Sequence, residues 1–174
     1  MPDIVEIGFR ERLLINIWRL SKKYKVSLVT SFLGLLVFII GFSTPHWAVL
    51  DGKQKTVSVG LWEICFDGYC DYLGIVGGWL AVTRTLECIG FIFILKALIV
   101  SLVYVCVPRF DTPGILYTQA GLHFVAALLV LVGDIIFGVY KAQDGYVISW
   151  SLVLTILMII LEITSGILVV LHSR

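Results

Sequence analysis

Charged residues are scarce in this chain of 174 residues: they form 14% of it, whereas roughly 25% is usual in soluble domains. Hydrophobic residues form 59%, and the mean hydropathy is +1.01. The net charge is only +1, and no basic stripe interleaved with aromatic residues occurs, which argues against nucleic-acid binding. The composition therefore excludes an ordinary water-soluble enzyme and predicts a membrane protein. Its expected binding partners include the lipid bilayer.

The sequence also lacks the motifs that carry catalysis or bind metals. It contains no P-loop, no G-x-S-x-G and no Cys-x-x-Cys. The three histidines, His46, His123 and His172, lie in separate segments and have no metal-ligand spacing. We therefore expect no enzymatic activity, no metal and no cofactor.

The sequence contains four long apolar runs. A transmembrane helix needs roughly 20 mostly apolar residues, and four runs meet this need, at about 26–44, 79–107, 114–140 and 147–171. The sequence predicts an all-α membrane protein: a transmembrane domain of four helices over residues 26–171, with a loop at 45–78 and a short tail at 172–174.

Positive charge indicates the orientation. Residues 1–25 carry six of the thirteen Lys and Arg residues, whereas the loop at 45–78 carries only Lys53 and Lys55. Because cytoplasmic flanks are usually the positive ones, we expect a multi-pass plasma-membrane protein with both termini in the cytoplasm and the loop outside. Apolar residues recur at helical spacing among the N-terminal charges, so this segment is either an amphipathic helix on the inner membrane surface or a basic disordered arm.

The loop at 45–78 has the pattern of a small antiparallel sheet. Short runs rich in β-branched and aromatic residues are separated by Asp51-Gly52 and Asp67-Gly68. Asp-Gly between such runs is a strong hairpin signal, because glycine accepts a positive φ. The sequence therefore predicts an extracellular sheet rather than a flexible linker.

A hairpin that turns at Asp67-Gly68 places Cys65 opposite Cys70. Such a non-hydrogen-bonded pair has Cα atoms about 4.5 Å apart, which is within disulfide range. Because the loop should face an oxidising compartment, we predict a Cys65–Cys70 disulfide. The other cysteines should be unpaired, and Cys106, near the cytoplasmic end of the second helix, is a candidate for acylation.

Charged residues also occur inside the apolar runs, where each costs about 2.5–3.5 kcal/mol to insert and needs a partner or a purpose. Counted at about 1.5 Å per residue, Lys96 and Glu162 should lie at similar depth near the middle of the membrane. Arg84, Glu87 and Asp134 should lie nearer the outer surface. We predict two polar layers, Lys96 with Glu162, and Arg84 with Glu87 or Asp134, that fix helix packing; the alternative is an ion or proton pathway.

The loop also carries a known spacing of residues, in the order Trp47, Gly60-Leu61-Trp62, Cys65 and Cys70. This resembles the W-GLW-C-C signature of the claudin and peripheral myelin protein superfamily, whose members have four transmembrane helices. Arg84 is similar to an arginine that follows in this family near the start of the second helix. The resemblance implies a claudin-like fold in which Trp47, the Gly60-Leu61-Trp62 tripeptide and Arg84 anchor the sheet on the helices.

The resemblance implies a structural role in cell–cell junctions, adhesion or a paracellular barrier. The partners would be the protein itself or related four-helix proteins, in the same membrane and in the opposite one. The loop carries four acidic residues against two lysines, a net charge of −2, from Asp51, Glu63, Asp67 and Asp71. Along a paracellular path these carboxylates would favour cations; otherwise they form a solvated face.

Three features depart from typical claudins. Only four residues separate the two loop cysteines, the second outer loop at about 141–146 is short, and the Tyr-Val ending is missing. The short second loop and the missing ending favour an alternative that the same superfamily includes, an auxiliary subunit of an ion channel or receptor, whose partner would be the pore-forming subunit.

Overall fold

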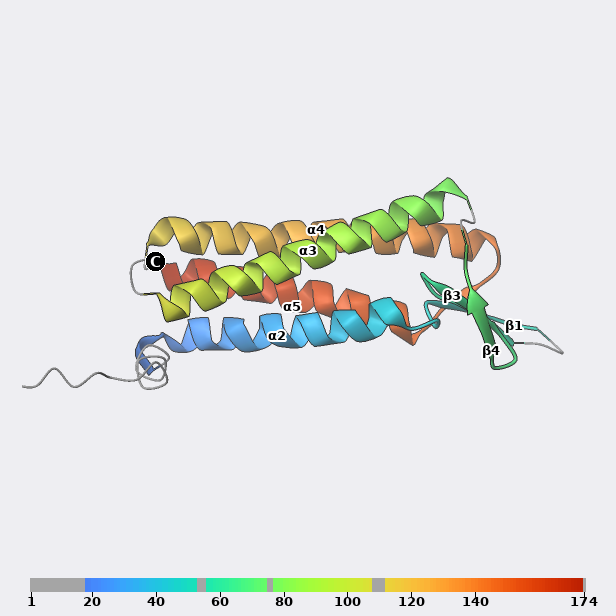
Figure 1. Cartoon of the computed structure of the whole chain (residues 1–174), viewed down its shortest axis with the longest axis horizontal. Helices are drawn as coiled ribbons and strands as arrows, with labels where there is room; N and C mark the ends of the chain where they lie inside the picture. The colour runs from blue at the N-terminus through green and yellow to red at the C-terminus, as the bar shows by residue number, and fades with distance from the viewer. Residues whose placement is uncertain (1–17, 53–55, 75–76, 108–111, 174) are drawn as a thin grey trace, which may run out of the picture.

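Four long helices and a small sheet make up the part of the chain that the computed structural model describes, residues 18–52, 56–74, 77–107 and 112–173. The helices are α2 (Lys22–Ser43), α3 (Gly78–Cys106), α4 (Pro113–Gln143) and α5 (Trp150–Ser173). All four are long and apolar enough to cross a membrane. Figure 1 shows them side by side, with the sheet at one end of the bundle. The predicted four-helix membrane fold with a small antiparallel sheet is therefore confirmed.

The helix ends differ slightly from those expected. Helix α2 begins at Lys22, four residues earlier than predicted, because the Ser21 hydroxyl caps it by accepting a hydrogen bond from the Tyr24 N–H. Helix α4 begins with Pro113, a position where the missing N–H of proline costs nothing. Most of the N-terminal segment predicted at 1–25 lies outside the described residues.

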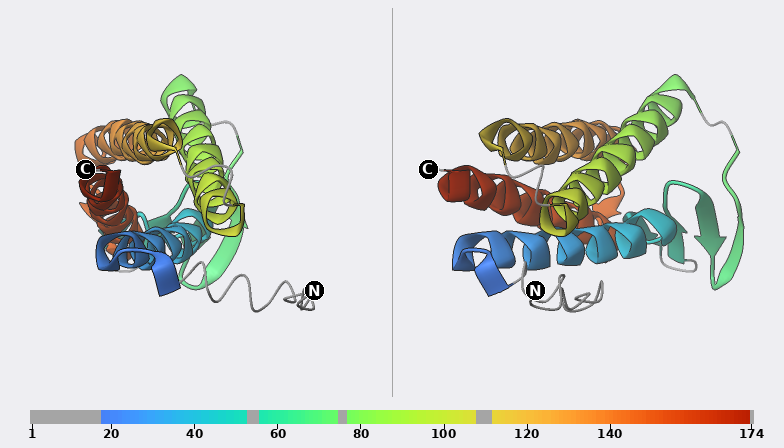
Figure 2. Two further views of the ribbon diagram at one scale, coloured as in Figure 1. Left: turned by 90° about the vertical axis from the view of Figure 1, so that its left-hand side faces the viewer. Right: turned by 60° about the vertical axis from the view of Figure 1, so that its left-hand side comes forward.

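The helices form a ring in which α2 packs on α5, α5 on α4, and α4 on α3. The end-on view in Figure 2 shows this arrangement, and its second view shows α3 inclined to the other three. The middle of the bundle is apolar, with a buried cluster that includes Phe38, Ile94, Val130 and Met158. Both the start of α2 and the end of α5 lie at the end opposite the sheet, where the Ser21 hydroxyl is 2.8 Å from Nδ1 of His172.

The sheet has five antiparallel strands in the order β4-β3-β2-β1-β5. Four of them come from the loop between α2 and α3: β1 (Ala48–Asp51), β2 (Thr56–Val59), β3 (Glu63–Phe66) and β4 (Tyr69–Tyr72). The fifth, β5 (Val147–Ile148), lies in the connection between α4 and α5 and pairs with β1. We expected residues 147–148 to begin the fourth helix, but they join the sheet, so both connections at this end of the bundle meet in one structure.

The β3–β4 hairpin has the predicted turn and register. Asp67 and Gly68 both have positive φ, 49° and 90°, as a tight two-residue turn requires. Cys65 pairs with Cys70 across the two strands. Strand β4 precedes α3 in the chain, so the hairpin connects the sheet to the start of that helix.

Candidate functional site

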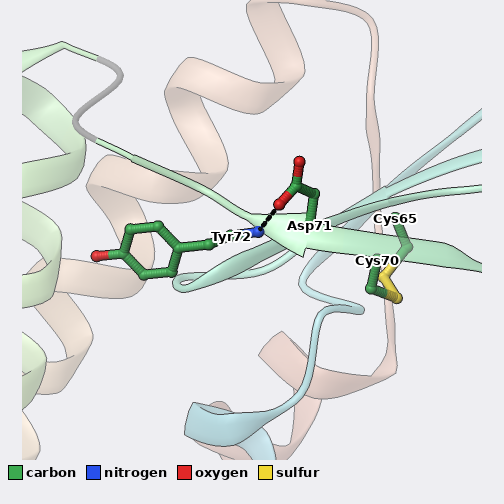
Figure 3. Close-up of a disulfide and its surroundings, with 4 residues drawn as sticks. All are labelled: Cys65, Cys70, Asp71 and Tyr72. Carbon is green, nitrogen blue, oxygen red and sulfur yellow. Dashed lines mark hydrogen bonds between the residues drawn. A yellow bond between two sulfur atoms is a disulfide. The ribbon is translucent and has the colours of Figure 1, made fainter.

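The disulfide joins Cys65 of β3 to Cys70 of β4, as predicted, and their Cα atoms are 4.0 Å apart. Cys65 is buried and Cys70 is exposed. Figure 3 shows the bond crossing between the two strands. The outermost strand of the sheet is therefore held to its neighbour by a covalent bond as well as by the backbone ladder.

Trp47 connects the start of β1 to the helices. Its side chain is fully buried, and Nε1 donates a hydrogen bond of 2.7 Å to the carbonyl oxygen of Gly41 in α2. The indole ring also meets Phe137 of α4 edge-on, with ring centroids 5.0 Å apart. Because one side chain contacts both α2 and α4, the first strand has a fixed position on the bundle.

Gly60 lies where the segment between β2 and β3 meets the end of α2. A Cβ atom at this position would be 2.6 Å from Cα of Pro45 and 2.7 Å from the carbonyl oxygen of Thr44. Both are backbone atoms, which cannot move aside as the end of a flexible side chain can. Glycine is therefore required here, and it lets the adjacent Leu61 side chain become fully buried.

Arg84, from the second turn of α3, joins the loop of the sheet to a third helix. Its Nε donates to the carbonyl oxygen of Leu61 at 2.7 Å, and Nη2 donates to that of Leu73. The guanidinium carbon also lies 5.1 Å from the centre of the Trp62 ring, a cation–π contact. We call Trp47, Gly60, Leu61, Trp62 and Arg84 the sheet anchor.

Arg84 does not pair with the buried carboxylates of the helices, so that part of the predicted layering is wrong. Its Nε and Nη2 atoms donate instead to the carbonyl oxygens of Leu61 and Leu73. Glu87 follows three residues after Arg84 in α3, and Asp134 lies in α4; their side chains are buried, at 0% and 4% exposed. Asp134 accepts a hydrogen bond of 2.9 Å from the Thr155 hydroxyl, and the Glu87 carboxyl group packs against Gly133.

The predicted pair between Lys96 and Glu162 is also not formed. Glu162 is fully buried, and its Oε2 is 2.6 Å from Nδ1 of His123. Lys96 is exposed on the outside of α3. The reason is the rotation of α3: Ile94 and Ala97 are its buried residues at this level, whereas Lys96 lies on the exposed side, and α5 packs mainly on α2 and α4.

Further polar contacts that the sequence did not reveal line the half of the bundle remote from the sheet. Ser27 and Ser165 share a hydrogen bond of 2.8 Å between α2 and α5. The Tyr24 hydroxyl donates to Oε1 of Gln119 at 3.0 Å, and the amide of that glutamine donates to Ser101. The partners lie on different helices, far apart in the chain, so no local sequence pattern indicates them. Between these groups and the Asp134–Thr155 pair lies the apolar cluster of Phe38 and Met158, which favours a packing role over a continuous pathway.

Strand β4 forms one edge of the sheet and pairs only with β3 in the described part of the chain. All four of its residues are exposed, with Tyr69 at 86% and Tyr72 at 69%. Figure 3 shows the Asp71 side chain on the side of the strand away from the disulfide, where Oδ1 accepts a hydrogen bond of 2.8 Å from the Tyr72 N–H. This edge therefore offers backbone groups and aromatic rings to another molecule.

The four acidic residues of the loop, Asp51, Glu63, Asp67 and Asp71, are all exposed. Asp67 also has a structural role: its Oδ1 accepts a hydrogen bond of 3.0 Å from the N–H of Thr56, the first residue of β2. Lys53 and Lys55 lie outside the described residues. A role for these carboxylates in selecting cations stays a prediction, as does acylation of Cys106, a half-buried free thiol at the last residue of α3.

Comparison with known proteins assigns no family to the chain: no family model matches it, and no curated protein matches it. The functional argument therefore depends on the geometry. That geometry combines four membrane helices, a sheet fixed to them by the sheet anchor, and an exposed edge strand held by a disulfide.

Proposed function

We propose that this protein is a claudin-like structural protein of cell–cell contacts, which assembles with itself or with related four-helix proteins through its sheet. The observation that carries the proposal is the exposed edge strand β4, with Tyr69 and Tyr72 on its surface. An edge strand has unpaired backbone groups that pair readily with another strand. Exposed tyrosines are typical of protein interfaces, where they bury a large area at low entropic cost.

The attachment of the sheet supports this role. An interface that bears load between cells needs a fixed angle to the membrane. The sheet anchor ties the sheet to α2, α3 and α4 through contacts of Trp47 and Arg84. The disulfide holds β4 to the rest of the sheet. A partner that binds β4 would therefore be held by the whole transmembrane bundle.

The proposed orientation follows from charge. The sheet lies at one end of the bundle, and the start of α2, with Lys22, Lys23 and Lys25, lies at the other. Positively charged flanks usually stay in the cytoplasm. With this orientation the sheet is extracellular, in an environment that permits its disulfide.

Expression in fibroblasts that have no junctions of their own tests the proposal, with freeze-fracture imaging of the cell contacts. We expect continuous intramembrane strands with the natural sequence, and short or absent strands with the double variant Tyr69→Ala and Tyr72→Ala. The matched control is Tyr117→Ala, which removes an exposed tyrosine from α4 near the opposite end of the bundle. Surface protein that forms no strands at contacts would refute the junction role.

A second candidate is an auxiliary subunit of an ion channel or receptor. The specific observation in its favour is the connection between α4 and α5, which is short and adds strand β5 to the sheet. It leaves no second projecting loop to reach an opposite cell. Co-purification of a pore-forming subunit in a fixed ratio, lost in the β4 double variant, would favour this function over the first.

A further inference from the structure

Lys96 is a charged residue on the outside of a membrane-spanning helix, far from both helix ends. At about 1.5 Å per residue it lies about 27 Å along the axis from Gly78 and about 15 Å from Cys106, the ends of α3. It is exposed and makes no hydrogen bond or ion pair within the described residues. Charged groups at membrane depth almost always face the interior of a bundle or have a partner, so this position requires an explanation.

The ammonium group lies over an aromatic ring of its own helix. Lys96 Nζ lies 5.3 Å from the centre of the Phe93 ring. Phe93 is one helical turn closer to the sheet, whereas the shorter way to water leads toward Cys106. A lysine that faces lipid alone normally extends its side chain to the nearer surface. Side chains on a helix lean toward its N-terminus, so the contact with Phe93 keeps the charge of Lys96 near the middle of α3.

Apolar side chains surround the lysine on the same face of α3. Ile92, Leu95 and Ile99 are 47%, 36% and 58% exposed. Their positions relative to Lys96 place them on one ridge of the helix. Helix α3 packs on α4 with its opposite side, where Gly90 and Ile94 are buried. The result is a ridge able to receive another helix, with a single positive charge at its centre.

We propose that this ridge of α3 binds a transmembrane helix of a different protein, one that carries an Asp or Glu at the depth of Phe93 and Lys96. A carboxylate there would neutralise the ammonium where the dielectric constant is low and ion pairing is strong. A lipid headgroup is a poor occupant, because its phosphate stays at the surface, whereas Lys96 lies about 15 Å along the axis from the nearer end of α3. This interaction uses a surface separate from the sheet and goes beyond the function proposed for it.

A second copy of the chain does not supply the carboxylate. The acidic residues within the described membrane helices, away from their ends, are Glu87, Asp134 and Glu162. They are 0%, 4% and 0% exposed. A neighbouring copy therefore presents no carboxylate on its lipid-facing surface, and two copies in contact at this ridge would bring like charges together. The partner must be another protein.

The test uses the full chain, purified and reconstituted in phosphatidylcholine vesicles with a fluorescent label on the sheet. The probes are synthetic leucine-rich peptides that span the bilayer once, with a single Asp placed at successive depths, or with leucine throughout. Energy transfer between label and peptide reports binding. We expect the peptide whose Asp matches the depth of Lys96 to bind about tenfold more tightly than the all-leucine peptide, as a charged pair in lipid should.

Substitutions at position 96 test whether Lys96 causes the preference for the Asp-containing peptide. Lys96→Leu and Lys96→Gln should both remove the preference for Asp, whereas Lys96→Arg should keep it. Lys22→Gln, which removes an exposed lysine at the first residue of α2, is the matched control and should change nothing. Because Lys96 is exposed and no hydrogen bond or ion pair joins it to another helix within the described residues, the variants should keep the Cys65–Cys70 disulfide and the unfolding temperature, which shows that they are folded.

Three results would overturn the proposal. One is equal binding of the Asp-containing and all-leucine peptides by the natural sequence. Another is self-association of the labelled chain that depends on Lys96 and needs no peptide, which would mean that a second copy is the occupant. The last is loss of the Asp preference when phosphatidylserine is added to the vesicles, which would identify an anionic headgroup as the ligand.

Discussion

Gly34 of α2 lies directly against the carboxyl group of Glu162 of α5: a Cβ atom on the glycine would be 2.7 Å from Oε1. The other carboxyl oxygen contacts His123 of α4. The side chain of Glu162 therefore fills a space between three helices, and the absence of a side chain on Gly34 creates that space. The glycine does not serve flexibility; it provides room for a buried polar group.

Gly34→Ala should lower stability, because the added methyl group collides with Glu162 in a closely packed region. We expect a loss of about 1–3 kcal/mol, the usual cost of overpacking a core. Thermal unfolding in detergent measures it. The control is Gly121→Ala in α4, where nothing lies within 4 Å of a new Cβ and the change should be neutral or slightly stabilising. Equal stability of the two variants would contradict the packing described here.

Gly60→Ala should disturb the seating of the sheet more severely. The new Cβ would meet backbone atoms of Thr44 and Pro45, which join α2 to β1. We expect retention inside the cell and reduced surface expression, measured by surface biotinylation. Gly74→Ala is the control, since a Cβ at that position has no neighbour within 4 Å. Normal surface delivery of the Gly60 variant would show that the sheet anchor tolerates a larger distance between residue 60 and the backbone of Thr44 and Pro45.

Arg84→Lys and Trp62→Ala should each impair folding or assembly. Lysine cannot reproduce the two hydrogen bonds of the guanidinium and its position over the indole ring. Since the two side chains are in contact, their effects should be non-additive by about 0.5–3 kcal/mol in a double-mutant cycle of thermal stability. Additive losses would mean that the two residues act independently of each other.

Cys65→Ser should reduce delivery to the cell surface, because it removes the covalent bond between β3 and β4 and leaves Cys70 as an unpaired thiol. Mass spectrometry of non-reduced peptides from the natural protein should show the two cysteines linked. Cys88→Ser, at a half-buried free cysteine of α3, is the matched control and should leave delivery unchanged. Alkylatable thiols at positions 65 and 70 in mature surface protein would refute this prediction.

Epitope tags at the two termini should be reached by antibody only after the cells are permeabilised. The expectation follows from the basic residues at the N-terminal side of α2 and from the even number of predicted spans. A tag inserted after Gly52, in the segment that follows β1, should be labelled on intact cells. Labelling of a terminal tag on intact cells would reverse the orientation and place the disulfide in the cytoplasm.

The sequence was sufficient for the features that depend on local pattern. Run length alone predicts membrane helices, because the bilayer sets the minimum length. The register of Cys65 and Cys70 follows from the Asp67-Gly68 turn, since a two-residue turn leaves one way to pair the strands. Both predictions use residues close together in the chain, where geometry leaves few alternatives.

The partners of the charged residues could not be predicted in the same way. A membrane helix is apolar on all sides, so periodicity does not show which side faces the bundle. Counting residues along the helices predicted a similar depth for Lys96 and Glu162 and so suggested a pair, but pairing also depends on how the helices are ordered and rotated. Strand β5 was missed for a related reason: two residues are too few for an alternating pattern, and only the position of β1 makes Val147 and Ile148 a strand.

The order of the strands also determines how the sheet would transmit a pull on β4 from the neighbour that the proposed function requires. A pull on β4 by a bound neighbour acts across the strands, parallel to the hydrogen bonds of the antiparallel ladders. The tension passes through β3, β2 and β1 to β5, and so reaches the hairpin of α4 and α5 as well as α2 and α3. The first ladder in this series is the one that the Cys65–Cys70 bond reinforces, and β4 also continues along the chain into α3. Traction at the edge is therefore spread over all four helices rather than concentrated on one loop.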